Sequence, residues 1–191
     1  TAIVATVSGD SITFGTPVVF NNTRTRTISS VYDPVATKVV VTYTDAGNSN
    51  RGTAVVGAVS GDSIAFGTPA VFTSGGLGYH SPTYDPAVNK VVIAYSDSGN
   101  SNYGEVISGT VSGDSISFDT PTEFNSGTTQ FISTTYDPVA NKVVVTYTDA
   151  GNSSYGTAAT YGPGGITTNL TSDNYIGVST GDYADGAEAT V

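Results

Sequence analysis

The hexapeptide VSGDSI stands at residues 7–12 and returns unchanged at residues 59–64 and 111–116. A second motif, YDP, recurs at the same interval and begins at Tyr32, Tyr84 and Tyr136. The interval is 52 residues in every case, without insertion or deletion. Self-similarity at a fixed period of this length is typical of repeat architectures. The 52-residue unit therefore decides the fold.

Each period reads as four β-strands, which in the second period are expected at residues 79–84, 90–96, 104–111 and 115–124. The first ends at Asp85-Pro86, where proline pre-sets φ for a turn and aspartate caps it. The second, KVVIAYS, is rich in β-branched and aromatic residues. Pro121 interrupts the fourth strand, as suits an outer edge. No segment has helical periodicity.

Four antiparallel strands in a unit of this size predict an all-β fold built from β-propeller blades. A solenoid of stacked sheets is the alternative. Blades at 27–72 and 79–124 are complete, residues 1–20 supply strands three and four of another, and residues 131–161 supply three strands. A propeller usually has about four to eight blades. We therefore expect an incomplete propeller, closed by repeats outside this sequence or by oligomerisation.

The repeat pattern stops after Tyr161. The stretch Gly162-Pro163-Gly164-Gly165 is typical of a linker, and the spacing beyond it differs from that of the repeats. We therefore divide the chain into propeller repeats at 1–161 and, at 162–191, a Gly/Pro linker with the start of a second small β module.

Composition excludes several classes of function. The 191 residues carry a formal net charge of −10, which opposes binding to nucleic acid or to an anionic membrane. No apolar run approaches the length of about 18 residues that a membrane-spanning helix needs. Cysteine is absent, so neither disulfides nor thiolate metal sites can form. We expect no nucleic-acid partner and no membrane insertion.

The unit that combines VSGDSI, YDP and the GNS turn resembles the repeat arrays of marine bacteriophage virion proteins, including cyanophage-like tail and fibre proteins. Residues 168–191 (TNLTSDNYIGVSTGDYADGAEATV) resemble the small module that often follows such arrays. The resemblance implies a structural or host-contacting virion component and carries over no catalytic residue. A weaker resemblance links the stretches that start at Asp45, Asp97 and Asp149 to the Asp-box hairpin of sialidase-like propellers, which is structural there.

The acidic residues favour a scaffold role. Nine of the sixteen occupy three repeated offsets, namely Asp10, Asp33, Asp45 and their copies, each in a turn where aspartate caps backbone N–H groups. Identical turns do not supply the two unlike carboxylates that a glycosidase needs. The D-x-G-N-S loops lack the spacing and the bidentate glutamate of an EF-hand. We therefore expect no cofactor, with calcium as the ion to test for.

Other side chains offer equally little for catalysis. His80 is the only histidine, so it cannot belong to a multi-histidine zinc site, and the serines have no evident base. The lysines at 38, 90 and 142 each follow a proline turn and are expected to pair with a nearby acid. The tyrosines at 32, 84, 136, 43, 95 and 147 are expected to pack between blades. We expect no enzymatic activity.

The differences between repeats point to a binding face. They are greatest in the connection from the fourth strand to the next first strand and just after the Asp-box-like turn, and in an up-and-down blade these lie on one face. Loops on a rigid scaffold are where binding normally sits. The candidate ligand-binding residues are Arg24, Arg26, Arg51, Tyr79, His80, Tyr103, Gln130, Phe131 and Tyr155. Aromatic, amide and guanidinium groups together suit a sugar, while neutral drift in exposed loops is the alternative.

These features predict a non-enzymatic virion structural protein, either a phage tail or fibre component or a head decoration, that contacts a host-surface glycan or receptor. The expected partners are other copies of the chain or other virion proteins, and the expected location is the virion or the extracellular space. A secreted or cell-surface bacterial adhesin or lectin is the alternative.

Overall fold

The computed structural model describes residues 1–162 and 165–170. It is 67% strand and 4% helix, and the helical residues form two short 3-10 turns, η1 (Ala46–Asn48) and η2 (Ser98–Asn100). All strand pairs among the described residues are antiparallel. The expectation of an all-β, antiparallel fold is confirmed.

The strands follow the 52-residue period. In chain order they are β1 (Ala5–Ser8), β2 (Ser11–Phe14), β3 (Thr25–Asp33), β4 (Lys38–Asp45), β5 (Arg51–Ser60), β6 (Ser63–Phe66), β7 (Ala70–Asp85), β8 (Lys90–Asp97), β9 (Tyr103–Ser112), β10 (Ser115–Phe118), β11 (Thr122–Asn125), β12 (Thr129–Asp137), β13 (Lys142–Asp149), β14 (Tyr155–Gly162) and β15 (Gly165–Leu170). Pro121 separates β10 from β11, as an interrupted outer strand requires.

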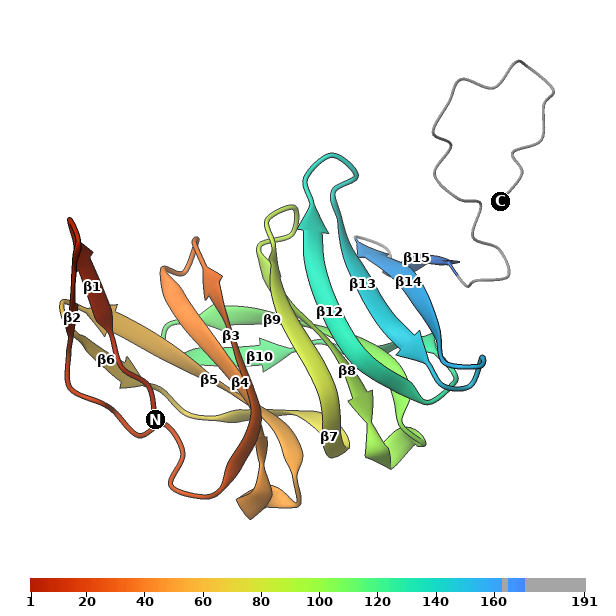
Figure 1. Cartoon of the computed structure of the whole chain (residues 1–191), viewed down its shortest axis with the longest axis horizontal. Coiled ribbons are helices and arrows are strands. Elements are labelled where there is room, and N and C mark those ends of the chain that lie inside the picture. Colours follow the sequence, from red (N-terminus) through yellow and green to blue (C-terminus); the bar gives the residue numbers. More distant parts are fainter. Residues whose placement is uncertain (163–164, 171–191) are drawn as a thin grey trace.

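The described strands form three hydrogen-bonded sheets of two, nine and four strands, and the continuous strand β7 divides the nine-stranded sheet into two units (Figure 1). The N-terminal hairpin is β1 and β2. The first unit contains β3, β4, β5 and β6 with residues 70–76 of β7, and the second contains residues 77–85 of β7 with β8, β9, β10 and β11. The third unit is the four-stranded sheet β12-β13-β14-β15.

Two strands differ from the sequence expectation. The inner strand of the second unit, expected at 79–84, is the end of the continuous strand β7, which leaves the edge of β5 and continues along β8. A glycine-rich link at 73–78 permits this because it stays extended instead of turning. The second is β15, which was not among the three strands expected for the last repeat. It pairs with β14, with Gly162 opposite Gly165, and adds a fourth strand to the third unit.

The units pack face to face because their central strands are apolar on both sides. Val91 and Ile93 of β8 join the core shared with the first unit, whereas Val92 and Ala94 join the core shared with the third. This alternation follows from the two-residue period of a strand. Each sheet thus needs a neighbour on both faces.

One aromatic contact repeats at every junction. Phe20 lies 5.2 Å from Tyr43, Phe72 lies 5.4 Å from Tyr95, and Phe124 lies 5.0 Å from Tyr147, measured between ring centroids. Each pair joins the outer strand region of one unit to the second strand of the next. The expectation that tyrosines pack between units is therefore confirmed for Tyr43, Tyr95 and Tyr147, whereas it is wrong for Tyr32, which is 55% exposed.

Among the described residues the sheets do not close into a ring. The N-terminal hairpin and β14–β15 lie at opposite ends of the row of sheets (Figure 1). Ile12 on the hairpin is 58% exposed, while Ile64 and Ile116, at the same repeat position, are 6% and 5% exposed. At the N-terminal end of the array, the surface around Ile12 is therefore exposed, whereas the equivalent surfaces around Ile64 and Ile116 are buried.

Candidate ligand-binding face

The acids of the DP turns hold the backbone of those turns. Asp137 Oδ1 accepts the N–H groups of Val139 and Ala140 at 2.8 and 3.1 Å. The carboxylates of Asp33 and Asp85 make the same type of bond to the residues that follow them. These aspartates serve the turns, as the sequence predicted.

A second set of acids ties the two kinds of varied loop together. Asp97 is fully buried, and its carboxylate accepts Gly99 N–H at 2.7 Å, Ser74 Oγ–H at 2.7 Å and Gly75 N–H at 3.0 Å. Asp45 accepts Thr23 Oγ–H at 2.6 Å and Gly47 N–H at 2.9 Å. The hydrogen bond from Thr23 is the main cause that lowers the pKa of Asp45. These carboxylates position the loops.

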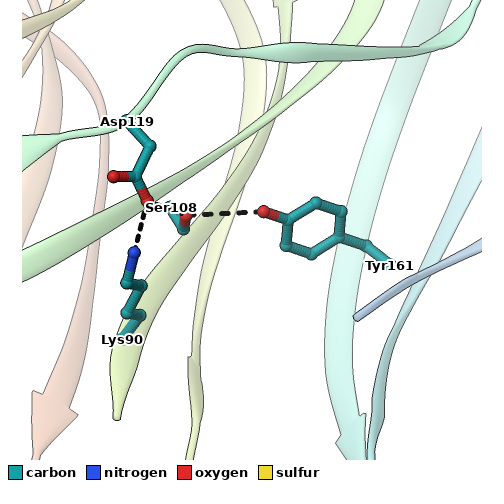
Figure 2. A network of polar contacts seen from close by, with 4 residues as sticks. All are labelled: Lys90, Ser108, Asp119 and Tyr161. Atoms are coloured by element: carbon teal, nitrogen blue, oxygen red, sulfur yellow. Dashed lines mark hydrogen bonds and ion pairs between the residues drawn. The ribbon is translucent and has the colours of Figure 1, made fainter. Parts of the chain in front are cut away.

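Two of the repeated lysines pair with acids, as expected. Lys38 Nζ lies 2.8 Å from Asp114 Oδ1 and so joins the first unit to the second. Lys90 Nζ lies 2.6 Å from Asp119 Oδ2 and lowers the pKa of that carboxyl group. Figure 2 shows this pair continuing through Ser108 to the Tyr161 hydroxyl of the third unit. These pairs belong to the face with the constant turns.

The opposite face carries two adjoining hollows. The larger has a volume of about 530 Å³ and is lined by Arg26, Thr27, Asn50, Tyr79 and Ser98 among others. The smaller, of about 250 Å³, is lined by Thr27, Ile28, Ser29, Tyr79, His80, Phe131 and Ile132. Because Thr27 and Tyr79 line both, the hollows form one continuous candidate site, which spans the inner strands of all three units.

Two aromatic rings meet in the candidate site. The ring centroids of Tyr79 and Phe131 lie 4.9 Å apart at an interplanar angle of 48°. Both side chains stay accessible, with exposed fractions of 40% and 66%. They come from neighbouring units, so only the packing of one unit against the next brings them together. The pair offers an apolar surface to a ligand.

The backbone beneath the site is strained. Thr27 has φ 43° and Phe131 has φ 50°, a region that β-branched and bulky residues rarely adopt. Both lie at irregular points of the strand register, between Arg26 and Ser29 and between Gln130 and Ser133. Bulges of this kind redirect side chains and often accompany functional sites.

His80 occupies the wall between the first and second units. Its Nε2 lies 3.0 Å from Thr42 Oγ1 of β4, and its Nδ1 is buried and has no hydrogen-bond partner. Burial lowers the pKa of His80 to about 4. The imidazole is therefore neutral near pH 7, and its free nitrogen can accept or donate a single hydrogen bond.

The structure brings four of the nine candidate residues into the hollows: Arg26, Tyr79, His80 and Phe131. Arg24, Arg51, Tyr103, Gln130 and Tyr155 do not line them. Arg51, Tyr103 and Tyr155 begin β5, β9 and β14 opposite the loop aspartates, and Gln130 pairs with Thr148 in the β12–β13 ladder.

Sequence reasoning did not single out Thr27 or Asn50 as ligand-binding residues. Asn50 stands beside Arg51 at a position that differs between repeats, so that variation was an available signal. Thr27 holds the same repeat position as Tyr79 and Phe131, so the repeat alignment was an available signal for it as well.

The described part of the chain holds no group of three or more His, Asp and Glu side chains placed to bind a metal ion. Within the same residues, no helix has the length and apolar character to cross a membrane.

Comparisons with protein-family models, with curated proteins and with solved structures return no match.

Proposed function

We propose that this chain is a segment of a β-propeller that serves as a non-enzymatic virion structural protein and contacts a host-surface glycan or receptor through its varied face. One observation carries the proposal. The same scaffold is built repeatedly with the same turns, while the side chains that differ between repeats include the aromatic pair and Arg26, which meet in a single accessible site. A constant scaffold with a varied binding face is the usual arrangement in recognition proteins.

The arrangement of the sheets supports the propeller. The inner strands β3, β7 and β12 contact one another in succession, and the sheets behind them stack face to face. A blade that lacks a neighbour leaves an apolar face in water. Further copies of the chain, or other virion proteins, would then cover the uncovered end.

The state of the acids supports a non-enzymatic role. Asp97 and Asp137 bind turn backbone, and Asp114 binds Lys38. No aspartate or glutamate lines either hollow. General acid–base catalysis needs a titratable group within reach of the substrate and a pKa near the working pH. His80 lines the smaller hollow, and burial lowers its pKa to about 4, away from neutrality.

A saccharide array tests the binding part of the proposal. We expect the full chain to bind at least one saccharide and Tyr79→Thr, which installs the residue of the first repeat, to weaken that binding. Retained binding by Tyr79→Thr would contradict the site.

Antibody labelling tests the location. Label on purified virions is expected, whereas label confined to the surface of bacterial cells would favour the adhesin or lectin alternative.

Sedimentation of the chain tests closure of the propeller by further copies. We expect the chain to associate at high concentration, and a strict monomer would contradict closure by further copies.

A further inference from the structure

We infer that the candidate site selects a negatively charged saccharide, in which a carboxylate or sulfate group on a sugar ring binds Arg26 while the ring packs on Tyr79. This inference rests on the proposed saccharide-binding function and adds the charge of the ligand. It assigns Arg26 as the specificity-determining residue.

The arginines of this acidic chain are concentrated at the varied face. The chain has six basic and sixteen acidic residues, yet its only three arginines all lie at the varied face in the first repeat: Arg24 just before β3, Arg26 near the start of β3 and Arg51 at the start of β5. No ion pair seen in the described residues involves an arginine. The site therefore offers unpaired guanidinium charge on a protein that otherwise repels anions.

The acidic residues near Arg26 are engaged by other partners. Asp45 and Asp97 stand at the base of the same loops, but backbone N–H groups and hydroxyls occupy their carboxylates. Neither lines a hollow. An incoming anion would thus meet Arg26 without competition from an acid that lines the site.

The chemistry of the remaining lining residues narrows the ligand to a sugar. Asn50 and Ser98 are neutral hydrogen-bonding residues in the same hollow as Arg26. Tyr79 and Phe131 add an apolar surface next to it. A hollow of about 530 Å³ falls within the range of roughly 300–1,000 Å³ that is usual for small-ligand sites. A ring that bears hydroxyls and one anionic group would use every one of these features.

Arginine suits this task better than lysine would. Its planar guanidinium presents donors in a fork that matches a carboxylate or sulfate with two parallel hydrogen bonds. The repeat offers a natural comparison, since the positions that correspond to Arg26 hold Gly78 and Gln130. Only the first repeat places a charge there.

The test uses the full chain and pairs of probes that differ only in charge. Oligogalacturonate is compared with its methyl ester, and dextran sulfate with dextran, by titration calorimetry. The variants are Arg26→Gln, which installs the residue of the third repeat, and Tyr79→Thr. The matched controls are Arg51→Gln, which removes the same charge outside the hollows, and Tyr155→Thr. Thermal melting verifies that each variant is folded.

We expect at least one charged probe to bind, and its uncharged counterpart to bind at least tenfold more weakly. A charge-assisted hydrogen bond predicts that Arg26→Gln weakens binding by about 10- to 100-fold. Arg51→Gln should change affinity by less than about twofold, because an exposed charge outside the site is screened by salt. Whichever of the two charged probes binds identifies carboxylate or sulfate as the group.

Three outcomes would overturn the inference. Equal binding of charged and uncharged probes that depends on Tyr79 but not on Arg26 would leave the proposed saccharide-binding function standing without the charge selectivity. Equal losses in Arg26→Gln and Arg51→Gln would show diffuse attraction in place of a site. No binding by any of the four probes would refute the anionic-saccharide site, while the wider saccharide array decides the proposed function separately.

Discussion

Gly67 of the first unit lies directly against the backbone carbonyl oxygen of Asp114 in the β9–β10 turn of the second unit. A Cβ atom on Gly67 would overlap that oxygen, so only glycine fits. Gly15 and Asp62 make the same contact one repeat earlier. The third member of the series is Asp119, and there the hairpin of the third unit departs from the repeat, with Gly162 opposite Gly165. This repeat position thus holds glycine where the turn of the next unit follows the repeat, and it holds aspartate where that turn departs from the repeat.

This contact predicts that Gly67→Ala destabilises the protein by about 1–3 kcal/mol or more, because the added methyl group must push one unit away from the next. Urea unfolding at pH 7.5 measures the free energy of unfolding. Asp119→Ala at the same repeat position is the control. It removes the ion pair with Lys90 and the hydrogen bond from Ser108 Oγ, whose hydroxyl keeps the Tyr161 hydroxyl as a partner, and should cost about 1 kcal/mol. Equal effects of the two substitutions would refute the steric explanation.

The fold was predictable where its signals are local. Strand β8 is a β-branched run bounded by turn residues, and Pro121 marks a break that the structure contains. The continuity of β7 was not predictable, because glycines at 73–78 suggest a turn whether or not the chain bends. Likewise, the glycine-rich stretch suggested a linker, although Gly162 ends β14 and pairs with Gly165, which begins β15.

The candidate site was predictable only as a face. Counting strands places the varied loops at one end of the units, but it does not say which of their side chains converge. Tyr79 meets Phe131 because β7 and β12 lie side by side, and Arg26 lines the larger hollow whereas Arg51 does not. Which side chains converge depends on the orientation of each unit relative to the next and on the left-handed backbone at Thr27.

The uncovered end predicts unequal effects of the same substitution in different repeats. Ile116→Ala removes methyl groups from a filled core and should cost about 2–5 kcal/mol. Ile12→Ala changes an exposed side chain and should alter the stability of the single chain by no more than about 0.5 kcal/mol. Unfolding is measured at low concentration, where association is weakest. A loss of more than about 2 kcal/mol for Ile12→Ala would mean that the hairpin is already covered.

The D-x-G-N-S loops predict indifference to calcium. Their aspartates already accept hydrogen bonds from backbone N–H groups, so a cation would have to displace these donors. An excess of EDTA should therefore shift the melting temperature by less than about 3 °C, which corresponds to roughly 1 kcal/mol for a chain of this size. A fall of 10 °C or so that added calcium reverses would identify these turns as metal-binding loops.

His80 predicts a loss of stability on mild acidification. Burial holds its pKa at about 4 in the folded chain, below the ordinary value of 6.5. The neutral form is therefore favoured by folding, and this contribution is fully present above pH 6.5 and is lost as the pH falls towards 4. Linkage gives a loss of roughly 2 kcal/mol between pH 7.5 and pH 5. Urea unfolding at the two pH values measures it.

His80→Ile is the matched variant, since isoleucine holds the same position in the first and third repeats as Ile28 and Ile132. The variant should lose most of the difference in stability between pH 7.5 and pH 5. Thr42 Oγ1 keeps a partner in the carbonyl oxygen of Ser29 at 3.3 Å, so the substitution leaves no orphaned hydroxyl. The carboxyl groups whose pKa is lowered, Asp45 and Asp119, lose their contribution only as the pH falls below about 4, outside this window. If wild type and His80→Ile lose equal stability at pH 5, the acid sensitivity does not come from His80.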